Sequence, residues 1–172
     1  MRSLTETKGS ARIAACGVLT ALALIFSYIE FLVPLPIAIP GIKLGLANIV
    51  CLVCLYALGE RYAFLINVTR IALAALLFGS VFSALYALAG GIVSFAVMAL
   101  LKRTKAFSAC GVSMAGGVFH NLAQLTVAGF LVESAQVFYY FPVLLLSGMA
   151  TGIGIGILAT LILRSIAKDS LV

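Results

Sequence analysis

A proline-rich segment at residues 34–48 decides how this chain folds. It reads PLPIAIPGIKLGLAN and joins two long apolar runs. Proline lacks a backbone N–H donor and disfavours helix at the residue before it, so the first apolar run must end here. We expect a second helix to begin near Gly41 or Ile42. Lys43 would then lie in its first turn, and Asn48 about 7.5 Å further along its axis.

Two interpretations of Lys43 remain open at this point. A positive charge at a helix N-terminus opposes the helix macrodipole, so Lys43 does not serve to stabilise the helix. It either offers a cation to an anionic ligand at the mouth of a pocket, or lies at the membrane interface with its apolar stem buried.

The composition places the chain in a membrane. Hydrophobic residues make up 64% of the chain and charged residues 9%, whereas soluble domains carry about 25% charged residues. A spanning helix takes about 20 residues, so 172 residues leave room for about six. We therefore expect an all-α membrane bundle forming one domain, residues 1–172, with transmembrane helices at about 11–33, 42–58, 62–78, 81–101, 108–132 and 142–163.

The distribution of basic residues predicts the orientation of this bundle. If six helices alternate in direction, Lys43 lies alone on one side, and the other side carries Arg2, Lys8, Arg12, Arg61, Lys102, Arg103, Lys105, Arg164 and Lys168. By the positive-inside rule both termini are then cytoplasmic, and Glu30 faces outside. We expect a multi-pass protein of the bacterial cytoplasmic (inner) membrane, embedded in the lipid bilayer, with no nucleic-acid partner.

Polar residues at similar depth on three of these helices indicate a ligand pocket. Asn67 and Arg70 share one helix face, and His120 and Gln124 lie one turn apart on another. Polar groups within a membrane are costly and usually face a bundle interior or a cavity. His120 has a second interpretation, a hydrogen-bonded core residue. The predicted ligand-binding residues are Lys43, Asn48, Asn67, Arg70, His120, Asn121 and Gln124.

Small residues at four-residue spacing predict close helix contacts. Ala11 and Ala15 form such a pair in the first helix, and Gly148, Gly152 and Gly156 form a longer stripe in the sixth. The partner of the first helix is either another helix of this chain or a second protein, and the residues alone favour the internal contact. The CxxC pair, Cys51 and Cys54, lacks a second ligand pair, so we interpret it as core packing.

The acidic residues are too few and too scattered for diphosphate or ATP chemistry. The chain has five, with no cluster to hold magnesium, and it has no Walker A motif. We therefore expect no catalytic residue, metal or cofactor. The predicted role is binding of a small anionic or amphipathic ligand from outside, as one component of a transporter.

Several segments resemble a known family. They are PGIKLGLANIV at 40–50 and GVFHNLAQ at 117–124, together with Glu30, Arg70, Gly79 and Gly90-Gly91. The resemblance is to the Gx transporter family, also named heptaprenyl diphosphate synthase component I, and extends from about Ala11 to Leu163. That family looks like the substrate-binding S components of energy-coupling factor (ECF) transporters.

The resemblance implies two alternative roles. As an S component, the chain would have a ligand site near the outer side and work with a transmembrane T component and two cytoplasmic ATPases. Ala11 and Ala15 would then contact the T component. The synthase name implies instead a non-catalytic membrane subunit that assists a soluble prenyl diphosphate synthase in menaquinone side-chain synthesis. We expect the transporter role first and keep isoprenoid synthesis as the alternative.

Overall fold

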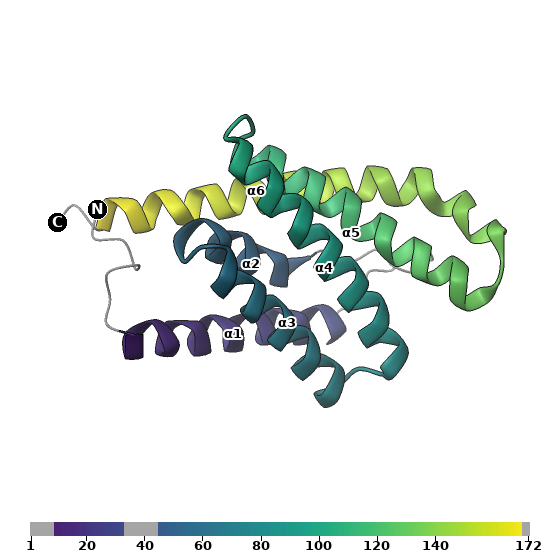
Figure 1. The fold of residues 1–172 in the computed structure, drawn as a ribbon, viewed down its shortest axis with the longest axis horizontal. Coiled ribbons are helices and arrows are strands. Elements are labelled where there is room, and N and C mark those ends of the chain that lie inside the picture. The colour runs from purple at the N-terminus through teal and green to yellow at the C-terminus, as the bar shows by residue number, and fades with distance from the viewer. Residues whose placement is uncertain (1–8, 33–44, 170–172) are drawn as a thin grey trace.

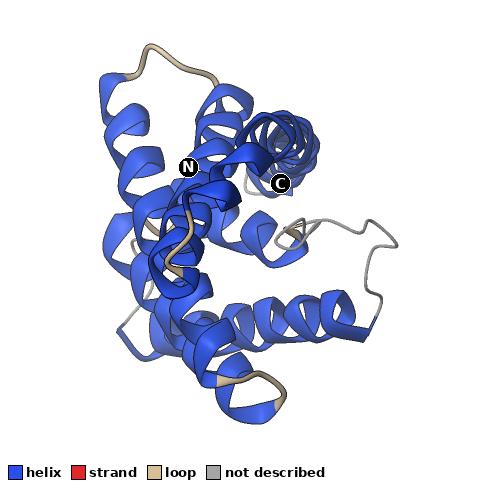
Figure 2. Ribbon diagram, turned by 90° about the vertical axis from the view of Figure 1, so that its right-hand side faces the viewer, coloured by secondary structure: helices blue, strands red, loops and turns tan. Residues whose placement is uncertain are grey.

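The computed structural model describes residues 9–32 and 45–169, and every regular element in them is helical. Figure 2 shows only helices and loops in this part of the chain, which confirms the predicted all-α class. The elements are α1 (Gly9–Leu32), α2 (Leu46–Ala57), α3 (Glu60–Leu77), α4 (Val81–Thr104), α5 (Ala109–Val132), the 3-10 helix η2 (Ala135–Tyr140) and α6 (Phe141–Asp169) (Figure 1).

Four of the six α-helices agree with the predicted bounds within three residues, whereas α2 begins later and α6 ends at Asp169, six residues beyond the predicted end. The predicted start of the second helix is too early, because Gly45 has a left-handed backbone (φ 75°) and α2 begins after it. The helix η2 was not predicted. It forms because Glu133 ends α5 in a left-handed conformation (φ 52°) and the Ser134 hydroxyl then accepts a hydrogen bond from the Gln136 N–H.

Four helical segments are long and apolar enough to cross a membrane. They are α1, α4, α5 and the continuous stretch of η2 and α6. Helix α2 has only 12 residues, and α3 carries Glu60, Arg61 and Arg70. The structure therefore supports a membrane protein with six α-helices in its described residues.

The short helix α2 forms the centre of the core. It packs against α1, α3 and α6, and in Figure 1 it lies between α1 and α6. Leu52, Cys54 and Leu55 are fully buried, and Cys51 is nearly so. The two cysteines of the CxxC pair thus lie in the apolar core, and both are free thiols.

Glycines bring α5 and α6 into backbone contact. A Cβ atom at Gly117 would lie 2.3 Å from the Gly148 carbonyl oxygen, and one at Gly152 would lie 2.6 Å from Met114 Cα. At Gly156 the corresponding distance to Cys110 Cα is 2.5 Å. The glycine stripe of α6 is therefore a close-packing face, as its spacing predicted.

Helix α1 is packed on one side only. It contacts α2 and α3, while Ile13 and Val18 on its outer side are 72% and 69% exposed. Ala11 is exposed and Ala15 is half-buried. The outer face of α1 is thus uncovered within the described chain.

Basic side chains tie three helix ends together. Lys102, at the end of α4, donates a hydrogen bond of 2.6 Å to the Leu55 carbonyl near the end of α2. A cation there complements the helix dipole. Arg103 donates to the Glu60 carboxylate at the start of α3, at 2.9 Å from Nε to Oε1, and this hydrogen bonding lowers the pKa of Glu60 below its ordinary value. We call this region, with the nearby ends of α5 and α6, the basic end of the bundle.

The glycine contact gives a direct prediction for stability. Gly152→Ala places a methyl group against the α5 backbone and should lower the free energy of unfolding by about 1–3 kcal/mol. Gly154→Ala is the matched control, because its Cβ would meet nothing within 4 Å. Thermal unfolding of both variants in detergent measures the difference. Equal melting temperatures would contradict the proposed contact.

Candidate functional site

A half-buried arginine and two asparagines meet within the bundle. Arg70 of α3 donates from Nη2 to Asn48 Oδ1 of α2 at 2.9 Å and to Asn67 Oδ1 at 3.1 Å. Its Nη1 also donates to the Ser27 hydroxyl oxygen of α1 at 3.3 Å. One guanidinium therefore joins three helices through oxygen acceptors. We call Ser27, Asn48, Asn67 and Arg70 the arginine cluster.

A carboxylate completes this site from α1. Glu30 Oε1 accepts hydrogen bonds from the Gly45 N–H and, at 3.0 Å, from the Leu46 N–H. These donors are among those that the first turn of α2 leaves without helical partners. Negative charge at a helix N-terminus is also favourable, and Glu30 lies close enough to Arg70 for their charges to interact.

The arginine cluster lies deep in the bundle. Arg70 is ten residues beyond Glu60, which places it about 15 Å from the basic end. Asn48 is nine residues from the end of α2, or about 13.5 Å. Both distances are about half of the 30 Å thickness of a bilayer's hydrocarbon core.

Two adjacent glycines let α4 pass between this cluster and a second polar group. Asn67 Nδ2 donates to the Gly91 carbonyl at 3.2 Å, and a Cβ at Gly91 would meet the same amide. On the other side, a Cβ at Gly90 would lie 2.8 Å from His120 Cε1 and 3.0 Å from Gln124 Cγ. The structure thus places His120 and Gln124 together, separated from the arginine cluster by the α4 backbone.

The remaining predicted residues have different positions. Asn121 points to α6, where its Nδ2 donates to the Leu144 carbonyl at 2.7 Å and to the Ser147 hydroxyl at 3.2 Å. This geometry is that of a clamp between two helices. Lys43 lies outside the described residues.

Sequence reasoning missed two members of the site. Ser27 was not singled out, and Glu30 was expected at the outer surface rather than at the start of α2. Their spacing of three residues places them on one face of α1, which is the signal that would have found them. Their partners in α2 cannot be read from that spacing.

Comparison with known families gives a match over most of the bundle. The model of the family described as heptaprenyl diphosphate synthase component I matches residues 19–162. The chain belongs to this family. The component I match begins in α1 and ends in α6, so it includes the arginine cluster, the Gly90-Gly91 pair and the glycine stripe. No curated protein and no solved structure matches the chain.

The arginine cluster predicts a stability effect. Arg70→Met leaves the Asn48 and Asn67 carbonyl oxygens without their donor, so the variant should lose about 1–3 kcal/mol of stability. Arg61→Met is a matched control on the same helix, because Arg61 is exposed. Thermal unfolding in detergent compares the two. If Arg70→Met and Arg61→Met have the same melting temperature, these hydrogen bonds do not hold the helices together.

Proposed function

We propose that this chain is the non-catalytic membrane subunit that assists a soluble prenyl diphosphate synthase, its component II. The observation that carries the proposal is the component I match, which runs through nearly the whole helical bundle. The four long apolar helical segments support a role at the membrane. The subunit would bind an anionic amphiphile and act where a water-soluble synthase meets the bilayer.

The division of labour follows from the acidic residues. Diphosphate chemistry uses magnesium ions held by carboxylates. The described residues contain no group of three or more His, Cys, Asp or Glu side chains placed to hold a metal ion. Since the matching family is described as one component of a synthase, we assign the reaction to the soluble partner. This subunit would bind the anionic amphiphile and position it at the membrane surface.

We propose that the basic end faces the cytoplasm and that all six helices lie in a bacterial cytoplasmic membrane. Lys102 and Arg103 lie at this end, where their hydrogen bonds join α2, α3 and α4. The positive-inside rule supports this orientation. A soluble cytoplasmic synthase would then approach the end of the bundle that carries these cations.

The arginine cluster is the proposed ligand site within the bundle. In the structure the Arg70 guanidinium is held by neutral oxygens of Ser27, Asn48 and Asn67. An anionic group forms shorter and stronger hydrogen bonds with a guanidinium than neutral oxygens do. A ligand anion would therefore replace Asn48 or Ser27. Of the other predicted ligand-binding residues, His120 and Gln124 lie across the α4 backbone from this cluster, Asn121 bonds to α6, and Lys43 lies outside the described residues.

A second candidate function, the S component of an ECF transporter, is favoured by helix α2. Twelve residues span about 18 Å, so α2 begins within the bundle, beside Glu30 and Arg70. Transporter sites are often built where such half-length helices start. In this role a T component would pack on α1 at Ala11 and Ala15, and two ATPases would bind on the cytoplasmic side.

The two functions predict different partners. Affinity purification of the tagged chain from native membranes, with mass spectrometry of the captured chains, should recover a prenyl diphosphate synthase subunit. Prenyl chain formation in membranes should then fall when this chain is deleted and return when it is restored. Capture of a T component with ATPases, and unchanged chain formation, would reject the synthase role in favour of transport.

The transporter candidate makes its own prediction for α1. Ala11→Leu and Ala15→Leu should reduce capture of a T component several-fold, because bulky side chains keep a neighbouring helix at a distance. Gly17→Leu, on the opposite side of α1, is the control, since a Cβ there meets nothing within 4 Å. Thermal unfolding of all three variants checks that each one is still folded. Equal capture by all of them would exclude contact through Ala11 and Ala15.

A further inference from the structure

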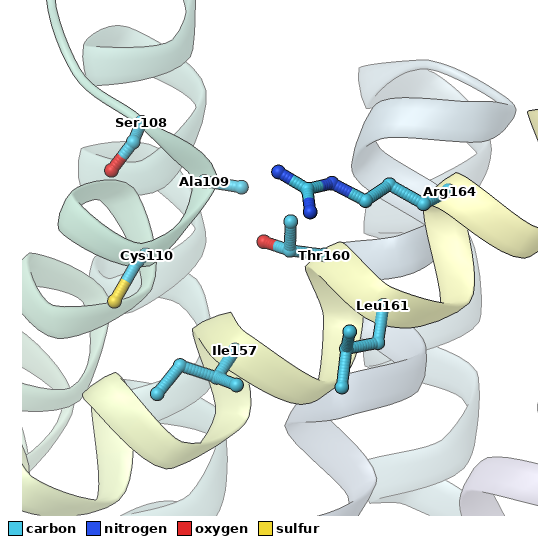
Figure 3. A pocket seen from close by; sticks show the side chains of 7 residues that line it. All are labelled: Ser108, Ala109, Cys110, Ile157, Thr160, Leu161 and Arg164. Atoms are coloured by element: carbon cyan, nitrogen blue, oxygen red, sulfur yellow. The ribbon is translucent and has the colours of Figure 1, made fainter.

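A pocket of about 320 Å³ lies at the basic end of the bundle, between the start of α5 and the last third of α6. Figure 3 shows the Arg164 guanidinium extending from α6 toward Ala109, with Thr160 beside it. The pocket lies apart from the arginine cluster and shares no residue with it. It is lined by Ser108, Ala109, Cys110, Ile157, Thr160, Leu161 and Arg164.

The pocket forms where the glycine stripe of α6 ends. Positions 148, 152 and 156 are glycines, and the same four-residue spacing continues with Thr160 and Arg164. At Gly156 the two helices touch, since a Cβ there would lie 2.5 Å from Cys110 Cα. One and two turns later, side chains replace the glycine hydrogens and face the start of α5. The separation of the two helices leaves the space between them.

Arg164 differs from three other cations of the bundle, which each donate hydrogen bonds to groups of the described chain. Lys102 donates to a carbonyl, Arg103 to Glu60, and Arg70 to amide oxygens. Within the described residues the Arg164 guanidinium makes no hydrogen bond or ion pair. No acidic residue lines the pocket. The pocket therefore has a net positive charge and an arginine with all of its donors available.

Two hydroxyl groups also line the pocket. Ser108 Oγ accepts a hydrogen bond from the Gly111 N–H at 3.2 Å, so its own proton remains available to a ligand. Thr160 Oγ1 donates to the Gly156 carbonyl at 2.7 Å and has no proton left to give. Figure 3 shows the Ser108 hydroxyl pointing away from Arg164, so the donor that enters the space between α5 and α6 is the Arg164 guanidinium, a group that suits phosphate oxygens.

The other wall of the pocket is apolar and opens to the outside of the bundle. Ile157 and Leu161 are 51% and 55% exposed and belong to a segment apolar enough to cross a membrane. A volume of 320 Å³ is at the lower end of the usual range for ligand sites, about 300–1,000 Å³. It suits a polar head group whose apolar chain continues along α6 into the lipid.

We propose that this pocket binds the phosphate head of an anionic amphiphile, with Arg164 on the phosphate and the apolar chain along Ile157 and Leu161. Two sources share this chemistry: a prenyl diphosphate and an anionic phospholipid. Only the first of them rests on the proposed function, since the soluble synthase would handle prenyl diphosphates at this end of the bundle. The phosphate site itself does not depend on the partner.

Protection of Cys110 tests the proposal, because this thiol lines the pocket. The full chain in an uncharged detergent is treated with a maleimide, and mass spectrometry quantifies the modification of Cys110. The probes are farnesyl diphosphate, phosphatidylglycerol and, as the uncharged control, farnesol. Binding measured by thermophoresis with the same probes gives a second readout that does not depend on thiol reactivity.

Three variants localise the effect. Arg164→Gln should raise the concentration for half-maximal protection at least about tenfold, because it removes the charged donor. Arg164→Lys keeps the charge and should lie between that variant and wild type. Arg61→Gln, an exposed arginine of α3 that does not line the pocket, should match wild type. All three changes are on exposed side chains, so folding should be retained.

Each outcome decides the proposal. Weaker binding of farnesyl diphosphate in Arg164→Gln supports a prenyl diphosphate site, and the same result with phosphatidylglycerol alone supports a phospholipid site. Equal binding of farnesol, or identical behaviour of Arg164→Gln and Arg61→Gln, overturns the proposal. Neither of these results changes which proteins co-purify with the chain, so failure of this site is distinct from failure of the proposed function.

Discussion

The N-terminal end of α2 imposes the constraint on which the rest of the structure depends. A helix of 12 residues begins inside an apolar bundle, where an unsatisfied backbone N–H costs several kcal/mol. Glu30 supplies the acceptor for the first two donors, but it brings a negative charge with it. Arg70 supplies the opposite charge, and the amides of Asn48 and Asn67 satisfy the guanidinium. Glu30 and the arginine cluster thus give partners to the polar groups at the start of α2, which lies inside the bundle.

The positions of the glycines follow from this arrangement. Asn67 can reach the α4 backbone only because Gly91 has no side chain, and Gly90 gives the same room to His120. Helices α5 and α6 are then joined to each other by backbone contact along a separate glycine stripe. Polar hydrogen bonds hold α2 and α3 to their neighbours, whereas α5 and α6 are held mainly by glycine backbone contact, with the Asn121 hydrogen bonds to Leu144 and Ser147 beside it. The two parts therefore respond to different kinds of substitution.

The sequence predicted what depends on local pattern. Apolar runs and their breaks predicted the α-helices, and four-residue spacing predicted the glycine contact of α6. Spacing also paired Asn67 with Arg70. It did not predict that Glu30 caps α2, because the two meet across residues 33–44 and only tertiary structure brings them together. Asn121 shows the same limit: it lies beside His120 in sequence, but the helix turns it toward α6.

The two arginine sites differ in what a ligand must do to occupy them. Arg70 is already satisfied by oxygens, so a ligand must displace one of them and gain more than the neutral hydrogen bond that it breaks. An anionic group meets this condition because its hydrogen bonds with the guanidinium are stronger than those of the amide oxygens. A neutral polar group does not, because it would replace one neutral hydrogen bond with another of similar strength. Arg164 has no such partners within residues 9–32 and 45–169, and its pocket is open at the apolar side. On these proposals, the inner site would select for charge, and the outer pocket would admit a charged head together with its chain.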